Sequence, residues 1–160
     1  MKDKTTDFNK IYRVHAQDVF KFAYWLSSSY DEAKDITSET FIRMWTAKVD
    51  IKFATVKAYL FMIARNLYLK SIQDKKRKTG LNESIVEPSD LSSNQETKSE
   101  LEVTLKALQG LPEIERSALV MRSFNGMTYE EISKSLNLSL SAVKVKIHRS
   151  RLKLLKIVKE

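Results

Sequence analysis

The sequence predicts an all-α fold: two small helical domains joined by a flexible acidic linker, the second domain being a helix-turn-helix. Only three glycines and two prolines occur in 160 residues, fewer than strand-and-turn folds need. Apolar residues recur instead at three- and four-residue steps. Residues 79–100 carry a net charge of −4, whereas residues 1–78 and 101–160 carry +7 and +5. The domains are therefore expected at 1–78 and 101–160, with the linker at 79–100.

The first domain is expected to contain about four helices. Apolar residues from Phe8 to Leu26 form one helical face, with a break near His15 as an alternative. Asp31 is expected to cap the next helix. A further helix starts near Thr55 and continues through four consecutive basic residues, and Gly80 is expected to end it.

The linker sequence, TGLNESIVEPSDLSSNQETKSE, is polar and acidic. It cannot bury enough apolar area to offset the entropy lost on ordering. The alternative is an ordered surface loop within a single domain.

The second domain begins with a helix around 101–108. Thr128 and Glu131 have the T-x-x-E spacing of a capping box, which predicts the start of the first helix of the helix-turn-helix. The other expected boundaries are Gly110 after the first helix, Pro112 at the start of the second, a turn at Asn125-Gly126, a turn at Asn137-Leu138, and Ser139 or Ser141 as the cap of the last helix.

The last helix is strongly basic. Seven residues between Ser139 and Lys159 are Lys or Arg and none is acidic, which favours a polyanionic partner over a merely solvated surface. Early residues of a recognition helix reach base edges, and later ones reach phosphates. The base-proximal candidates are Lys144, His148 and Arg149, and the phosphate candidates are Lys146, Arg151 and Lys153.

Composition excludes several other classes of protein. A net charge of +8 favours nucleic acid or an anionic surface as the partner. There is no cysteine, and His15 and His148 lie far apart, so no metal site or cofactor is expected. The polar N-terminus and the short longest apolar run, 58–64, predict a soluble cytoplasmic protein without membrane insertion. No convergent acids, nucleophile or metal cluster indicates catalysis, so an enzyme with catalytic residues is not expected.

Three segments resemble a known family. The stretch LPEIERSALVMRSFNGMTYEEISKSLNLSLSAVKVKIHRSRLKLL, residues 111–155, resembles the C-terminal promoter-binding domain of bacterial sigma factors. The stretch DEAKDITSETFIRMW, residues 31–45, looks like the segment with which that family grips RNA polymerase. AYLFMIARN, residues 58–66, looks like the segment leading into its promoter-reading helix. Together they resemble the extracytoplasmic-function (ECF) subfamily of the sigma-70 family over nearly the whole chain.

The resemblance implies a subunit that binds core RNA polymerase and directs promoter-specific transcription initiation. It implies that Asn66 reads a −10 base, since an amide offers both a donor and an acceptor to an exposed base edge. The residues implied to hold the −10 strand are Lys70, Lys75, Lys76 and Arg77. Those implied to face the −35 duplex are Ser141, Lys144, Val145, Lys146, His148, Arg149 and Arg151.

Asp31, Asp35 and Glu39 are spaced to share one helix face, which on its own could be a solvated surface or a weak metal site. The resemblance implies instead a contact with the clamp of the largest polymerase subunit, with Phe41, Ile42 and Trp45 adding apolar contact. It also implies contact with the polymerase flap, passage of the acidic linker toward the RNA exit channel, and an anti-sigma factor as a further partner. A solubilising spacer is the alternative for the linker.

The chain departs from the family pattern at several positions: Ser38, Lys70, Gln73, Ser141, Ala142 and Val145. The last three predict an unusual −35 preference. The main alternative function is a helix-turn-helix regulator of the response-regulator output type. Such a regulator would carry an N-terminal receiver of alternating strands and helices, a pattern that residues 1–78 lack.

Overall fold

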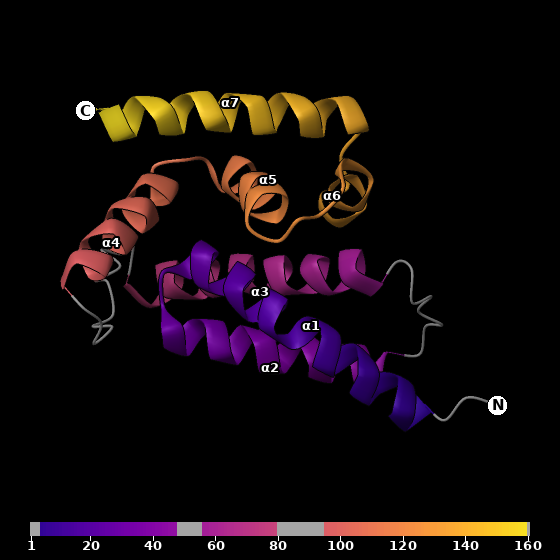
Figure 1. Ribbon diagram of the computed structural model, residues 1–160. Helices are drawn as coiled ribbons and strands as arrows, with labels where there is room; N and C mark the ends of the chain where they lie inside the picture. The colour runs from indigo at the N-terminus through magenta and orange to yellow at the C-terminus, as the bar shows by residue number, and fades with distance from the viewer. Residues whose placement is uncertain (1–3, 48–55, 80–94, 160) are drawn as a thin grey trace.

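The computed structural model describes residues 4–47, 56–79 and 95–159, and every regular element in these ranges is a helix (Figure 1). This confirms the predicted all-α class. The helices are α1 (Lys4–Ser27), α2 (Tyr30–Thr46), α3 (Val56–Thr79), α4 (Gln95–Gln109), α5 (Glu113–Ser123), α6 (Tyr129–Leu136) and α7 (Leu140–Lys159). We call α1–α3 the N-terminal lobe and α4–α7 the C-terminal lobe.

Helix α1 is continuous, so the alternative of a break near His15 is wrong. His15 is only 9% exposed and lies in register with Ile11, Val19, Phe22 and Leu26 on the buried face. Its pKa is lowered, first by burial and then by the nearby charge of Lys57. A largely buried imidazole therefore continues the apolar stripe instead of interrupting the helix.

Helix α2 begins two residues earlier than expected, and its cap is Ser29, not Asp31. The Ser29 hydroxyl accepts a hydrogen bond from the Glu32 backbone N–H at 3.2 Å. Ser28 adopts a left-handed conformation, with φ of 58°, and so turns the chain out of α1 directly before this cap. Asp31 instead lies in the first helical turn, where its charge is favourable.

The expected start near Thr55, the stop at Gly80 and most of the linker lie outside the described residues. Helix α4 begins at Gln95, so residues 95–100 are helical and extend the helix expected from residue 101. The division into two domains at these boundaries stays a prediction.

The helix-turn-helix consists of α6 and α7, and its local signals are confirmed. Thr128 and Glu131 form the predicted capping box, with reciprocal hydrogen bonds of 3.1 and 2.9 Å. Asn137 ends α6 in a left-handed conformation, with φ of 53°. Ser139, rather than Ser141, caps α7, because its hydroxyl accepts a bond from the Ala142 N–H at 3.1 Å.

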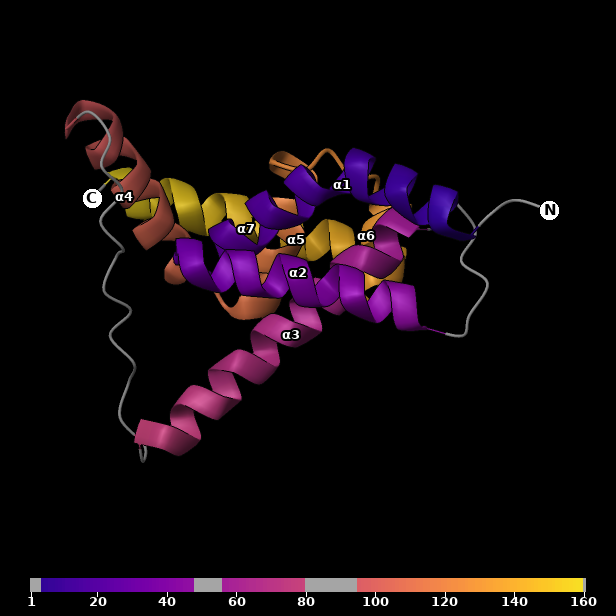
Figure 2. The same cartoon turned by 90° about the horizontal axis from the view of Figure 1, so that it is seen from below.

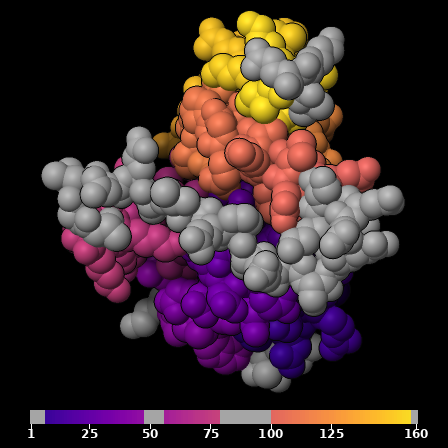
Figure 3. All heavy atoms as spheres, turned by 90° about the vertical axis from the view of Figure 1, so that its left-hand side faces the viewer, coloured from indigo at the N-terminus to yellow at the C-terminus, as the bar shows by residue number. Residues whose placement is uncertain are grey.

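The two lobes pack against each other along α5 and α6 on one side and α1 and α3 on the other (Figures 1 and 2). Trp25 and Phe124 stack with ring centroids 4.6 Å apart. Arg65 and Glu113 form a two-bond ion pair across the same boundary. Buried apolar residues of both lobes form one cluster. Helix α7 consequently lies at the edge of the molecule farthest from α1 and α2 (Figures 1 and 3).

Candidate nucleic-acid interface

Helix α7 has one buried face and one open face. Val143, Ile147 and Ser150 follow one another at four- and three-residue steps and are at most 1% exposed. The Ser150 hydroxyl bonds to the Lys146 and Glu115 carbonyls, which ties α7 to α5. The opposite side of the helix is exposed.

The open face carries the residues expected to meet the −35 duplex. Exposed there are Ser141, Lys144, Val145, His148, Arg149 and Arg151, while Lys146 is half-buried. Lys153, which is expected to contact phosphate, has its ammonium 2.8 Å from the Glu115 carboxylate. That ion pair holds Lys153 against α5.

An aromatic ring that sequence reasoning did not select lies beside this face. The Arg122 guanidinium lies 4.3 Å from the centroid of the Tyr129 ring, and the Lys144 ammonium lies 5.7 Å from it. The three side chains come from α5, α6 and α7, so no local spacing could have linked them. The only signal in the sequence was the position of this tyrosine, directly after the capping residue Thr128.

The −10 candidates lie on α3. Asn66, Lys70, Lys76 and Arg77 are exposed. Lys75 is exposed as well, but its ammonium contacts the Glu32 carboxylate at 2.8 Å. All five therefore belong to one helix, α3, and one of the cations is held by α2.

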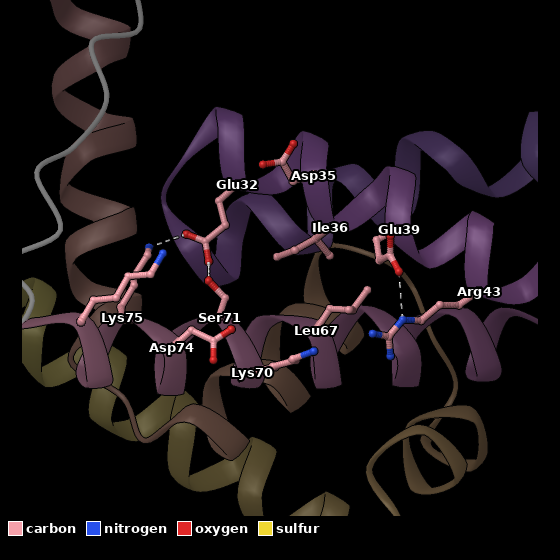
Figure 4. A pocket seen from close by; sticks show the side chains of 11 residues that line it. Glu32, Asp35, Ile36, Glu39, Arg43, Leu67, Lys70, Ser71, Asp74 and Lys75 are labelled. Carbon is pink, nitrogen blue, oxygen red and sulfur yellow. Dashed lines mark hydrogen bonds and ion pairs between the residues drawn. The ribbon is translucent and has the colours of Figure 1, made fainter.

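A groove separates α2 from α3 and brings the polymerase candidates close to the −10 candidates (Figure 4). Glu32 and Glu39 line the α2 side, while Lys70 and Lys75 line the α3 side. Glu32 accepts hydrogen bonds from Ser71 and Lys75. Sequence reasoning missed Glu32, although its three- and seven-residue spacing to Asp35 and Glu39 places it on their face.

The remaining polymerase candidates differ in accessibility. Asp31 and Asp35 are exposed, and Asp35 extends away from α3 in Figure 4. Glu39 pairs with Arg43 at 3.3 Å. Ile42 is 54% and Trp45 is 38% exposed, but Phe41 is only 2% exposed. Phe41 therefore supports the exposed pair from within the core.

An apolar groove beside Ile42 and Trp45 was not anticipated. It is lined by Phe8 and Tyr12 from α1 together with these two residues and Phe41. The Phe8 and Trp45 rings lie 4.8 Å apart, edge to face. The four-residue spacing of Phe8 and Tyr12 was the available signal.

Within residues 4–47, 56–79 and 95–159, no three or more His, Asp or Glu side chains gather in a way that could hold a metal ion. None of the helices described has both the length and the apolarity needed to span a bilayer.

Comparison with known proteins identifies two family regions. The family profile "Sigma-70 region 2" matches residues 11–78, and "Sigma-70, region 4" matches residues 101–154. The chain is 30% identical over 143 residues to the ECF RNA polymerase sigma factor EcfG of Rhodopseudomonas palustris, covering 83% of this chain and 75% of that protein. It is 32% identical over 152 residues to ECF sigma factor SigE of Mycolicibacterium smegmatis, covering 90% of this chain but 58% of that protein.

Two solved structures share the fold. One is the sigma factor RpoE in complex with the anti-sigma factor NepR from Bartonella quintana, with a TM-score of 0.74, 23% identity, and coverage of 96% of this chain and 97% of that one. The other is CnrH in complex with the cytosolic domain of CnrY, with a TM-score of 0.72, 23% identity, and coverage of 97% and 89%. With both family regions matched in order along an all-helical chain, the protein belongs to the ECF sigma factors of the sigma-70 family, whose function is promoter-directed transcription initiation.

Proposed function

We propose that this chain binds core RNA polymerase through α2 and recognises promoter DNA through α3 and α7. The observation that carries the proposal is the open face of α7, where exposed basic residues follow a capped helix-turn-helix. In this motif the second helix enters the major groove. The chain itself supplies no chemistry in this scheme, because the polymerase catalyses RNA synthesis.

The −35 duplex lies along the open face of α7 in this proposal. Ser141, Val145, His148 and Arg149 approach base edges, and later basic residues such as Arg151 approach phosphates. Val145 is 46% exposed and offers only apolar contact, which suits a thymine methyl group. The sequence preference of this helix should therefore include a thymine opposite Val145.

The −10 element lies along α3. Asn66 is exposed and its amide can both donate to and accept from an unpaired base edge. Lys70, Lys75, Lys76 and Arg77 follow on the same helix and attract the strand backbone. The proposed base-reading residue therefore precedes the proposed backbone-binding residues along the same helix.

Polymerase binding is assigned to α2. Asp31 and Asp35 are exposed, and Ile42 and Trp45 add an apolar surface two helical turns farther along. This mixed surface suits the clamp of the largest subunit, and the C-terminal lobe is proposed to meet the flap. We also propose action in the cytoplasm and control by an anti-sigma factor, since one similar solved structure is a sigma factor in complex with the anti-sigma factor NepR.

Simultaneous contact with both promoter elements requires the lobes to separate. Helix α6 packs on both α3 and α7, so α3 and α7 lie no more than about 20 Å apart where α6 joins them, at ordinary helix-packing distances of about 10 Å. The −35 and −10 elements are about 25 base pairs apart, or about 85 Å at about 3.4 Å per pair. The packed arrangement therefore represents the protein before promoter engagement.

A paired charge reversal tests the assignment. Lys144→Glu with Arg149→Glu should abolish promoter-specific transcription by the reconstituted holoenzyme while leaving core polymerase binding intact. Lys106→Gln, which removes an exposed charge from α4, is the matched control. Loss of core binding in the double variant, or undiminished promoter-specific transcription, would show that the DNA surface is misplaced.

A further inference from the structure

The Glu32 carboxylate joins α2 to two successive turns of α3 (Figure 4). One oxygen, Oε1, accepts a hydrogen bond from the Ser71 hydroxyl, and the other, Oε2, lies 2.8 Å from the Lys75 ammonium. The Glu32 side chain is only 13% exposed, so little water competes for its oxygens. We call these three residues the α2–α3 bridge.

The bridge reaches the part of α3 that extends beyond the core. Figure 2 shows the C-terminal end of this helix projecting beyond α1 and α2. Ile72 packs against the buried core, whereas residues 73–78 are all exposed. The ion pair at Lys75 therefore attaches an exposed part of α3 to α2 and fixes its direction.

Lys75 lies on a different side of α3 from the residue proposed to read a −10 base. An α-helix has about 3.6 residues per turn, so the nine positions from Asn66 to Lys75 make about two and a half turns. The four positions to Lys70 and the eleven to Arg77 make about one and three turns. Asn66, Lys70 and Arg77 consequently share one side of α3, and Lys75 is on the opposite side.

The charges on these two sides also differ in how far they are neutralised. Lys75 is paired with Glu32, so the pair presents no net charge to a DNA phosphate. Within the described part of the chain, neither Lys70 nor Arg77 forms an ion pair within 4 Å. The cations available to a DNA strand are therefore those beside Asn66.

We propose that Glu32 is a positioning residue for −10 recognition: through its bonds to α3 it holds the Asn66 side of that helix toward the DNA strand. The inference rests on the proposed reading of the −10 element by α3. It revises the role of Lys75 from strand contact to attachment of α3 to α2. Because Glu32 lies between Asp31 and Asp35, the bridge also ties the direction of α3 to the surface proposed to contact polymerase.

Positioning affects base reading more than backbone attraction. A hydrogen bond to a base edge requires a donor–acceptor distance of about 2.7–3.2 Å. Attraction between a cation and a phosphate acts over about 10 Å at 0.1 M salt. A change in the direction of α3 should therefore lower selectivity at the −10 motif and leave the salt dependence of binding nearly unchanged.

The test removes or exchanges the ion pair without changing the net charge. Glu32→Gln with Lys75→Gln deletes the pair, and Glu32→Lys with Lys75→Glu forms it again with the charges exchanged. Each double variant is assembled with core polymerase. Its binding to a single-stranded oligonucleotide with the −10 motif of a promoter that the holoenzyme transcribes is measured across about 50 to 200 mM salt. A second oligonucleotide with that motif mutated gives the selectivity, which is the ratio of the two affinities.

The neutral double variant should lose selectivity about two- to fivefold, the effect expected for one partly exposed ion pair, with an unchanged slope of log affinity against log salt. The exchanged variant should recover selectivity to within about twofold of the wild type, because the two substitutions compensate each other. If Lys75 contacted a phosphate instead, the neutral double variant would lower the slope by about 0.7, equally on both oligonucleotides.

The controls separate positioning from charge and from folding. Lys70→Gln should lower the slope by about 0.7 and keep the selectivity, since Lys70 is an exposed cation on the Asn66 side. Lys106→Gln, which removes an exposed charge from α4, should change neither quantity. Core binding and thermal unfolding report whether each variant is assembled and folded. If the neutral double variant does not fold, Ser71→Ala removes the other bond to Glu32 and should lower selectivity in the same direction.

Three results would overturn the positioning role of Glu32. They are unchanged selectivity in the neutral double variant, failure of the exchanged variant to recover selectivity, and a slope lowered by about 0.7 when Lys75 is neutralised. Equal affinity of the wild-type holoenzyme for the matched and mutated oligonucleotides would instead overturn the proposed function.

Discussion

The ion pair between Arg65 and Glu113 makes a strong prediction about stability, because it joins the two lobes. Arg65 donates from Nε to Glu113 Oε1 at 2.7 Å and from Nη2 to Oε2 at 2.8 Å. The Ser117 hydroxyl donates to the same Oε1 at 2.7 Å. The two charged side chains are only 15% and 20% exposed. We therefore expect Glu113→Ala to leave a largely buried, unpaired guanidinium.

The magnitude follows from burial and hydrogen bonding. Removing one partner of a fully buried pair costs about 3–5 kcal/mol. Because Arg65 keeps some access to water, we expect about 2 kcal/mol for Glu113→Ala. In a double-mutant cycle with Arg65→Ala, the coupling energy should be about 1.5–3 kcal/mol, the range for hydrogen bonds to charged groups.

The pH dependence provides a second, independent measurement. Burial raises the pKa of Glu113, but hydrogen bonds from Arg65 and Ser117 and the charges of Arg65 and Arg116 outweigh it, so the net pKa is below the usual 4.5. A carboxylate with a lowered folded pKa stabilises the fold above its unfolded pKa and loses this contribution as pH falls through the folded pKa. The destabilisation by Glu113→Ala should therefore be full at pH 7 and shrink below about pH 4.5.

Urea unfolding of the wild type, both single variants and the double variant at pH 7 and at about pH 3.5 measures both quantities. Glu39→Ala is a matched control, because its pair with Arg43 is 46% exposed on both sides and should contribute less than about 1 kcal/mol. A coupling energy below about 0.5 kcal/mol, or a destabilisation that does not shrink in acid, would refute the reasoning.

Two further predictions concern the N-terminal lobe. Asp35→Lys combined with Trp45→Ala should weaken binding to core polymerase at least about tenfold, because the proposed contact loses both an exposed carboxylate and an aromatic side chain. Unchanged affinity in a pull-down titration with core polymerase would contradict the assignment of α2 to polymerase binding. His15 has a lowered pKa, so the unfolded chain binds its proton more readily, and stability should fall as pH drops below 6.5. His15→Gln should flatten that pH dependence in thermal unfolding, and an identical profile would contradict the effect of burial on His15.

Local signals account for the parts of the fold that sequence alone predicted. The capping box at Thr128 and Glu131 and the turn at Asn137 act through bonds between neighbouring residues, so their spacing is sufficient to locate α6. The cap of α2 was harder, because Ser29 and Asp31 both have suitable side chains. The left-handed conformation of Ser28, which selects Ser29, depends on how the chain turns from α1 to α2.

The contacts that the sequence did not predict join distant segments of the chain. Arg122, Tyr129 and Lys144 meet only after three helices pack together. Glu32 reaches Ser71 across the α2–α3 groove, and Arg65 reaches Glu113 across the lobe boundary. No periodicity in a single helix encodes these pairs. The sequence could identify which residues are basic or acidic, but not which of them are already held by a partner.

Transcription in vitro with core RNA polymerase on a genomic DNA library tests the central claim most directly. Wild-type protein added to core polymerase should start transcripts at a restricted set of sites that share one −10 motif and one −35 motif at fixed spacing. Asn66→Ala should relax selection at the −10 motif, and Lys144→Glu with Arg149→Glu should eliminate selection at the −35 motif. Initiation that stays random, or that requires another sigma factor, would contradict the account.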